Sequence, residues 1–397
     1  MTQSPGGDNT SSNPTRRFDE PAQDNEEKQR YKFEREELRN LCQAARRIVY
    51  PEIKMNQHHN AEYSPSQILD VLTHAALTND YTTNGSKTYG ILGGDSPHPN
   101  SILYRVRKLE LQEILNQFNS AVECTIREVR KRGMLRGRID LAIDTTEWLY
   151  YGDENDPMVV KTRHRNGTNK AYRFATVNIL INGERFTLKA IPMTQFTPRE
   201  KILGELLDYA EKIVRIGIIY VDRAFFTVDC IRILQEKNVK FLMPAIKNKR
   251  VKGEMMSGVP RIVDFEYGVN RKDSVKFKLV VVEDEEKTSR AFATNLQVET
   301  VRAQELFELY SKRWGIETSY RVKSCLRPKT TSKNYEVRLF YFMFSVCLYN
   351  LWVLVNLLAG TRIGKDFGGL LVTAKMFCAA MCFPASAGEE GRDRPPD

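Results

Sequence analysis

The segment Ile216–Asp222 (IGIIYVD) narrows the possible folds more than any other part of the chain. It is a nearly continuous apolar run that ends in a single carboxylate. Such a run is typical of a strand buried on both faces, in the middle of a sheet whose parallel strands are covered by helices. Helical patterns at 198–216 and Val228–Lys237 supply the crossovers that parallel strands need. We therefore expect an α/β domain.

Further strands are expected on both sides of this segment. Arg138–Asp144 alternates at the two-residue period of a strand, and it also ends in a carboxylate. Phe174–Ile181 and Arg185–Pro192 are separated by an Asn-Gly pair, which is a strong hairpin signal. With a short strand at Val239–Met243, the order predicts a three-stranded meander followed by βαβα units. The expected fold is a mixed sheet with helices on both faces.

The length of 397 residues suggests two or three domains. Both ends of the chain are polar and too poor in apolar residues to bury a core. In chain order we expect a disordered tail at 1–28, a helical domain at 29–135, the first part of the α/β core at 136–245, a β-rich insertion at 246–300, the second part of the core with C-terminal helices at 301–360, and a C-terminal tail at 361–397.

The net charge of +10 favours a polyanionic partner such as DNA. In the helical domain, one helix opens at Ser64 and a second begins near Pro99, after a loop that contains Gly and Asp. Arg105, Arg107 and Lys108 make the second helix basic, as in a helix-turn-helix that reads the major groove. A solvated basic face on a small helical bundle gives the same pattern.

Other basic stretches could follow a DNA backbone. A third helix near 110–132 ends in the basic run REVRKRG. Lys161–Arg173, Lys247–Lys252 and Arg327–Lys333 lie around the two strand-end carboxylates in the sequence. Each stretch alone is equally typical of a solvated loop, but three around one acidic site favour contact with DNA.

Leu339–Leu358 is twenty residues long without a charge, which is enough to cross a bilayer. A helix that is apolar all round can equally be buried in a large core. This segment contains Ser345, Asn350 and Asn356, and no second apolar run of this length exists, so we expect a buried helix and no membrane partner. No signal peptide is visible. The seven cysteines show no zinc-ligand spacing and indicate reduced thiols in a cytoplasmic protein.

Two carboxylates lie at the carboxyl ends of predicted strands, where a ligand is expected. Asp144 and Asp222 each follow an apolar strand, and ligands of open α/β sheets gather at the carboxyl ends of strands. Magnesium prefers such carboxylates together with water and substrate phosphate. Either acid could instead cap a helix or a loop. Asp140 shares the strand face of Asp144 and is the alternative to it. Other competing acids are Glu147, Asp153 and Asp156 in the following loop, and Asp229, which we expect to be exposed.

A third element whose side chains could take part in catalysis or binding is the helix that contains YSKRWGIETSYRVKS. At 100° per residue, five of its side chains fall on one face about 80° wide. They are Tyr310, Arg313, Glu317, Tyr320 and Arg321. An acid aligned with two arginines and two tyrosines indicates more than packing, although a surface ladder of ion pairs would share the pattern.

This helix resembles the Tyr-Arg-Glu-Lys signature of prokaryotic insertion-sequence transposases that use an Asp-Asp-Glu triad. Tyr310, Arg313 and Glu317 match its spacing, whereas Ser324 stands at the lysine position and Lys323 comes one residue earlier. By helical arithmetic Lys323 points roughly 100° away from the face, so Arg321 is the better candidate for the missing cation. The resemblance extends to IDTT, to VDRAF and to the basic β insertion, and it covers about 60–360.

The resemblance implies a ribonuclease-H-like core in which Asp144, Asp222 and Glu317 are catalytic. They would hold two Mg²⁺ ions per active site, with Mn²⁺ as a substitute, for cleavage at transposon ends and strand transfer into target DNA. Tyr310 and Arg313 would hold phosphate oxygens. The remaining DNA-binding candidates are Arg321, Lys323, Arg105, Arg107 and Lys108. The expected partners are transposon-end and target DNA and a second copy of the chain, in the cytoplasm of a prokaryote.

Two other functions remain open at this point. A ribonuclease-H-like nuclease without strand transfer would share the triad and the metals. A catalytically inactive DNA-binding protein derived from a transposase would explain the serine at position 324.

Overall fold

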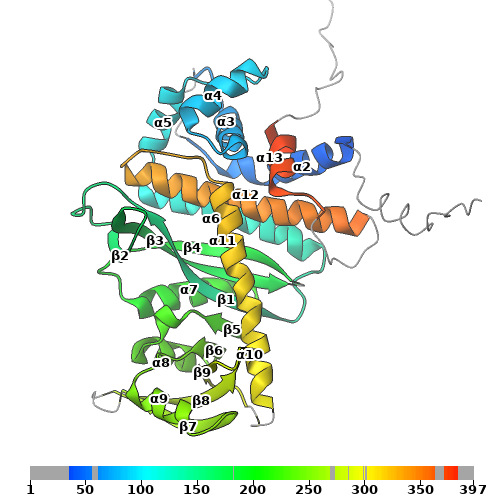
Figure 1. Ribbon diagram of the computed structural model, residues 1–397. Coiled ribbons are helices and arrows are strands. Elements are labelled where there is room, and N and C mark those ends of the chain that lie inside the picture. The colour runs from blue at the N-terminus through cyan, green and yellow to red at the C-terminus, as the bar shows by residue number, and fades with distance from the viewer. Residues whose placement is uncertain are drawn as a thin grey trace, which may run out of the picture.

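The computed structural model of the chain places a nine-stranded sheet beneath and beside a layer of long helices (Figure 1). It describes residues 35–55, 61–181, 183–268, 273–284, 286–297, 299, 302–362 and 371–382. The tail expected at 1–28 lies outside the described residues. The described elements form a mixed sheet flanked by helices, as expected from the sequence.

The sheet is built from strands in the order β2-β3-β1-β5-β6-β9-β8-β7, with β4 also paired to β3. Its strands are β1 (Arg138–Leu149), β2 (Val159–Arg165), β3 (Thr168–Ile181), β4 (Glu184–Met193), β5 (Arg215–Val221), β6 (Lys240–Pro244), β7 (Arg261–Tyr267), β8 (Val275–Glu283) and β9 (Ser289–Thr294). The three neighbours β1, β5 and β6 are parallel, and the other pairs are antiparallel. The meander and the parallel centre predicted from the sequence are therefore both present.

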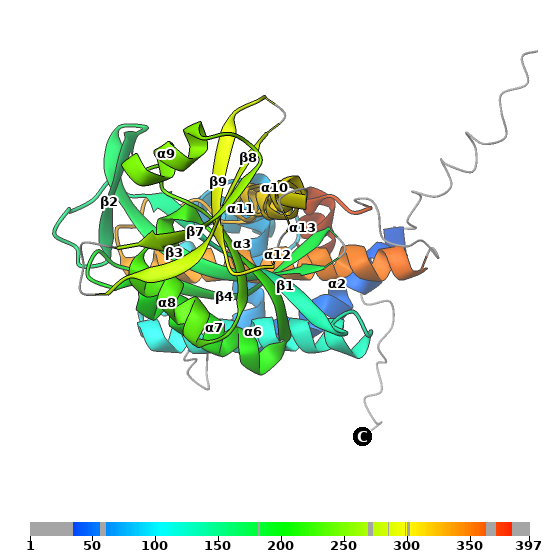
Figure 2. The ribbon, with the colours of Figure 1, turned by 90° about the horizontal axis from the view of Figure 1, so that it is seen from below.

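Helices cover both faces of this sheet (Figure 2). Along the chain they are α2 (Arg35–Val49), α3 (Pro65–Thr78), α4 (Thr82–Ile91), α5 (Pro99–Arg107), α6 (Leu111–Lys131), α7 (Arg199–Ile213), α8 (Val228–Glu236), α9 (Lys249–Met256), α10 (Ala303–Ser311), α11 (Gly315–Cys325), α12 (Tyr335–Arg362) and α13 (Ala374–Cys382). One face packs against α6, α7, α8 and α12, which share the larger core. The other face forms a smaller core with α10 and α11.

The segment at 246–300 does not stand apart from the sheet. β9 pairs antiparallel with β6, so β7, β8 and β9 extend the central sheet by three strands. The segment is β-rich as expected, and it also contains helix α9, which the sequence did not predict. Its cap is local, because the Asn248 side chain accepts a hydrogen bond from the Val251 amide at 2.9 Å. Which chain segments pair in a sheet depends on partners that local periodicity does not identify.

Three more segments contain elements that the sequence did not predict. The basic stretch Lys161–Arg173 is not a loop, because β2 and the start of β3 form a hairpin there. Within the tail expected at 361–397, residues 374–382 form helix α13, which buries Phe377, Cys378 and Met381 against α2 and α3. In the helical domain, α4 is an additional helix between the two expected ones, and it is followed by the expected loop.

The apolar segment at 339–358 lies within α12, which is long and apolar enough to cross a membrane but is almost wholly buried in the protein. It packs against α2, α5 and α6 on one side and against β4 and α11 on the other. This helix joins the N-terminal helices to the sheet, so its uniform hydrophobicity reflects neighbours on all sides. The sequence-based expectation of a buried helix agrees with this position.

One polar residue fixes α12 against the sheet. The Asn350 side chain accepts from the Thr187 amide at 2.9 Å and donates to the Thr187 carbonyl at 2.8 Å. Thr187 lies in β4 where the register with β3 shifts, and both residues are fully buried. Without Asn350, these two backbone groups would lose their side-chain partner in the core.

We expect Asn350→Leu to lower the free energy of unfolding by about 2–4 kcal/mol, because it leaves two buried backbone groups unsatisfied. Urea unfolding followed by circular dichroism measures the loss. Ser345→Ala is the matched control, since the Ser345 hydroxyl is equally buried but donates only to Phe342 in its own helix. Equal losses in the two variants would contradict this role of Asn350.

Candidate active site

The fold brings Asp144 and Asp222 together on neighbouring parallel strands. Ile143 is the register partner of Val221, and the Asp222 amide donates to the Ile143 carbonyl at 3.0 Å. Asp222 follows β5 directly and caps a short 3₁₀ helix at Arg223–Phe225, with its carboxylate accepting from the Ala224 amide at 3.3 Å. The two acids are therefore held at the same level of the sheet by backbone hydrogen bonds.

The position of Asp144 within its strand differs from the expected one. β1 does not end at Asp144 but continues to Leu149, paired only with β3 beyond the point where β5 stops. The end of β5 therefore leaves one side of β1 without a strand partner next to Asp144. The Asp144 carboxylate therefore lies where the parallel pairing of β1 with β5 ends, although β1 itself continues.

The third element is not one continuous helix. α10 ends at Ser311, a 3₁₀ turn spans Lys312–Trp314, and α11 begins at Gly315. At this break Arg185 of β4 donates from Nη2 to the Lys312 carbonyl at 2.8 Å. A Cβ atom on Gly315 would lie 1.8 Å from Cζ of Arg185, so the glycine makes room for the guanidinium. The assumption of 100° per residue across this segment was therefore wrong, because the turn is tighter there.

Arg313, in the 3₁₀ turn, forms the closest contact to the paired acids. Its Nη1 donates to Oδ2 of Asp144 at 2.7 Å, and each side chain is only 9% exposed. The guanidinium also lies 5.1 Å from the centre of the Tyr310 ring, whose hydroxyl donates to the Val221 carbonyl at 3.4 Å. Tyr310 and Arg313 thus lie beside the two acids, at the point where β5 ends.

Burial and neighbouring charges shift the pKa values of Asp144 and Arg313. Burial raises the pKa of Asp144 to about 6, with Asp222 and Glu317 adding to the rise and Arg313 opposing it. For Arg313, burial acts to lower the pKa, but Tyr310 and the acids outweigh it and the pKa is raised. Asp222 and Glu317 therefore both act electrostatically on Asp144, as expected where carboxylates share a cation site.

Glu317 and Arg321 lie on the exposed side of α11. Arg321 donates to the Thr318 hydroxyl at 3.1 Å, and its guanidinium faces solvent. Tyr320 points inward, and its hydroxyl shares a 2.6 Å hydrogen bond with Thr176, the register partner of Asp144 on β3. Of the residues expected on one helix face, Arg313, Glu317 and Tyr320 surround the site, whereas Arg321 lies further along the surface.

Lys323 is buried, in contrast to a residue expected to bind DNA. It is 2% exposed, its Nζ donates to the Ser319 hydroxyl at 3.2 Å, and it lies 4.8 and 4.6 Å from the ring centres of Tyr320 and Tyr349. Burial lowers the pKa of Lys323 to about 7, while Asp144 opposes the shift. This lysine therefore supports α11 from inside the protein. The helical arithmetic that placed it away from the exposed face is confirmed.

The competing acids have other partners. Asp140 accepts from the Ile218 amide at 2.9 Å and from the Tyr220 hydroxyl at 3.0 Å. Glu147 forms ion pairs with Arg165 and Arg173. The others are similarly engaged: Asp153 with Asn155, Asp156 with Tyr172 and Met158, and the exposed Asp229 with Arg232. These contacts give each of the competing acids a structural role.

The three candidate acids fit Mg²⁺ by donor type, because they offer only carboxylate oxygens. Among the residues that the structure describes, no three His, Cys, Asp or Glu side chains are close enough together to hold an ion as they stand. In this arrangement Oδ2 of Asp144 accepts from Arg313, and Oδ2 of Asp222 accepts from the Ala224 amide. The chemistry of the donor set fits a divalent metal, while these side chains would have to change partners to hold it.

The basic residues of α5 lie on the far side of α12 from the sheet (Figure 1). Arg107 and Lys108 are exposed, and Nζ of Lys108 lies 4.4 Å from the centre of the exposed Tyr104 ring. Arg105 is half-buried and donates to the Tyr63 carbonyl at 2.7 Å. α5 thus presents a small basic and aromatic surface at one end, with Ile102 and Val106 facing the core.

Comparison with known proteins assigns the family. The transposase DDE domain family matches residues 136–351, which is more than half of the chain and contains all three candidate acids. The chain belongs to this family, and its sheet has the ribonuclease-H-like class expected from the sequence. No curated protein matches it. Among solved structures, a piggyBac transposase synaptic complex with hairpin DNA is 12% identical, with a TM-score of 0.49 over 86% of this chain and 77% of that chain.

Proposed function

We propose that this protein is an active DNA transposase, which cleaves DNA at the ends of a mobile element and joins those ends to target DNA. The observation that carries the proposal is the backbone pairing of β1 with β5, which holds Asp144 beside Asp222. Glu317 comes from the helix that covers the same end of the sheet and perturbs the pKa of Asp144. Such a set of acids fits phosphoryl transfer by a metal-dependent enzyme.

The candidate catalytic residues are Asp144, Asp222 and Glu317, which would hold two Mg²⁺ or Mn²⁺ ions. Bound there, the ions would activate the attacking water or 3′-hydroxyl and stabilise the leaving oxygen. Arg313 lies next to these acids, and its planar guanidinium suits a phosphate oxygen as well as a carboxylate. Tyr310 holds Arg313 over its ring and so orients it toward the same place.

The remaining contacts with DNA are proposed from exposure and charge. Arg321 is accessible on α11, whereas Lys323 is buried and supports the helix. Arg107 and Lys108 on α5 are accessible to a duplex, and Arg105 is held by the Tyr63 carbonyl beside them. Joining two ends of one element would require two active sites, so we propose a homodimer in the assembly with DNA.

We further propose that the chain belongs to the prokaryotic insertion-sequence group with the Tyr-Arg-Glu-Lys type of signature, and that it acts in the cytoplasm at the nucleoid. Tyr310, Arg313 and Glu317 keep the signature spacing. Ser324 stands at the position of the signature lysine, and the neighbouring Lys323 is buried against the Tyr320 ring, within electrostatic reach of Asp144.

Cleavage of a plasmid-borne element by the purified protein tests this function. We expect Mg²⁺-dependent release of the element by the wild type, none in EDTA, and a loss of about a thousandfold or more in Asp222→Asn. Asparagine preserves the shape of Asp222 and can still cap the Ala224 amide. Strand transfer is scored by recovery of the element in a second plasmid.

Two results would replace the proposal with an alternative. Cleavage without any joined product would indicate a nuclease of the same fold. DNA binding without cleavage in Mg²⁺ or Mn²⁺ would indicate a DNA-binding protein that has lost the activity of its family.

A further inference from the structure

The amino-terminal ends of the parallel strands, opposite the candidate active site, are strongly basic. The parallel strands β1, β5 and β6 begin at Arg138, Arg215 and Lys240, so these three cations lie at the same edge. Arg138 and Arg215 are direct register partners. A cleft of about 770 Å³ at this edge is lined by all three residues.

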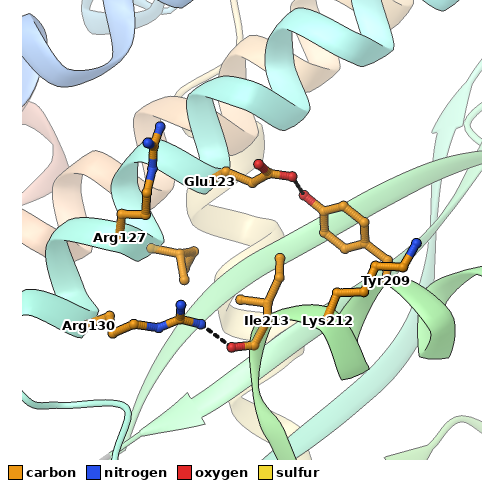
Figure 3. Close-up of a pocket in the computed structure, with 7 residues that line it drawn as sticks. Glu123, Arg127, Arg130, Tyr209, Lys212 and Ile213 are labelled. Carbon is orange, nitrogen blue, oxygen red and sulfur yellow. Dashed lines mark hydrogen bonds between the residues drawn. The ribbon is translucent and has the colours of Figure 1, made fainter.

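A second hollow lies between α6 and α7, close to the first. It has a volume of about 280 Å³ and is lined by Arg127 and Arg130 from α6 and by Lys212 from α7. Figure 3 shows the side chains of the two helices facing one another across it. Arg130 donates to the Ile213 carbonyl at the end of α7, and Tyr209 donates to the Glu123 carboxylate at 2.6 Å.

The two hollows adjoin, because Lys212 and Ile213 line one and the next residues, Val214 and Arg215, line the other. Together they form a continuous surface across the ends of α6 and α7 and the starts of three strands. We name it the basic strip and define it by six residues: Arg127, Arg130, Arg138, Lys212, Arg215 and Lys240.

The positive charge of the basic strip is not neutralised within the described part of the chain. None of its six residues forms an ion pair there. Among the nearby acids, Glu128 pairs with Lys131 and Arg132, and Asp208 and Glu211 pair with Lys237. Glu123 also lines the second hollow, where it accepts a hydrogen bond from the uncharged Tyr209 hydroxyl. Like charges on adjacent strands, such as Arg138 and Arg215, repel one another and cost stability. A polyanion laid along the strip would relieve this repulsion.

The basic strip is too far from the candidate acids to hold the reacting phosphate. Arg215 and Asp222 stand seven residues apart along β5, which is roughly 20 Å at the rise of a strand. A strip that runs over several elements and two hollows matches a series of phosphates better than one isolated anion. Under the proposed function, the polyanion that the protein binds is duplex DNA.

We propose that the basic strip binds the phosphate backbone of duplex DNA, at a segment away from the end that reacts and without reading base sequence. The proposal deepens the proposed function, on which its choice of DNA as the polyanion rests. It requires no cleavage, because phosphate contacts depend only on charge and shape. The chain would then contact DNA at two places, one at the candidate acids and one at the opposite edge of the sheet.

Binding of a random-sequence duplex in EDTA tests the strip apart from any chemistry. In the full-length chain, Arg127→Gln/Lys212→Gln/Arg215→Gln is expected to lower affinity about tenfold or more and to reduce the salt-dependence slope by about 2–3. The matched control is Arg232→Gln/Lys278→Gln/Arg261→Gln, which removes the same charge from residues already in ion pairs. Fluorescence anisotropy gives both quantities, and circular dichroism checks folding.

A second measurement does not depend on the folding of a variant. In the wild-type protein, duplex DNA should protect Lys212 and Lys240 from acetylation, as read by mass spectrometry, while Lys278 remains reactive. Equal effects of the two triple variants together with unprotected strip lysines would overturn the proposal and leave the proposed function untouched. Reduced binding and protected lysines in a chain that never cleaves DNA would support the strip and count against the proposed function.

Discussion

Replacing Asp144 by asparagine is expected to lower Mg²⁺-dependent DNA cleavage by about a thousandfold or more, because a neutral amide cannot serve as an anionic metal ligand. The amide oxygen can still accept the hydrogen bond from Arg313, so much of the local geometry should persist. Cleavage of an end-containing duplex, expressed per folded molecule, is the measurement. Binding of Mn²⁺ followed by electron paramagnetic resonance should weaken in the same variant.

Asp140→Asn provides the matched control for this prediction. Asp140 lies on the same strand, but its two oxygens accept from the Ile218 amide and the Tyr220 hydroxyl. We expect that variant to lose stability, by about 1–2 kcal/mol, and to keep its cleavage rate per folded molecule. If Asp140→Asn abolished cleavage while Asp144→Asn kept it, the roles assigned to the two acids would have to be exchanged.

The second large effect is expected from Arg313→Met, which leaves the Asp144 carboxylate buried without its ionic partner. Breaking a buried ion pair from one side costs about 3–5 kcal/mol of unfolding free energy at neutral pH. Both members of this pair are 9% exposed. Arg232→Met is the control, because its ion pair with Asp229 is largely solvated, and a loss below about 1 kcal/mol is expected. Urea unfolding measures both.

The destabilisation in Arg313→Met should shrink as the pH falls. In the folded wild type the pKa of Asp144 is already raised to about 6 from its ordinary 3.8, and Arg313 is the neighbour that opposes the rise. Without Arg313 the pKa rises further, so the folded variant holds a proton that the unfolded chain releases above about pH 4. Its stability relative to wild type therefore increases from pH 8 toward pH 5. A difference that stays constant over this range would contradict the assignment to Asp144.

Local patterns in the sequence were sufficient for the elements that carry the acids. The apolar run before Asp222 needed no partner to be identified as a buried parallel strand, because burial on both faces demands uniform hydrophobicity. The same physical reason identified α12 as a long apolar helix. The order of Asp144, Asp222 and Glu317 along the chain, with their flanking motifs, was enough to indicate the family that the comparison then assigned.

Only the tertiary structure decided how the third element meets the other two. Arg185, far away in the sequence on β4, lies against Gly315 and donates to the Lys312 carbonyl, at the 3₁₀ turn from which Arg313 reaches Asp144. Helical arithmetic within α11 places Lys323 away from the exposed face of Glu317, but only the packing of α11 shows that it is buried beside Tyr320 and Tyr349.

The sheet and the helical layer show the same division. Local periodicity specified most of the strands, but the pairing of β9 with β6 and the packing of α13 against α2 and α3 join segments distant in the chain. Hydrophobic periodicity records how much of each segment is buried. Which distant segment buries it depends on shape and hydrogen bonding between surfaces that exist only once the chain has folded.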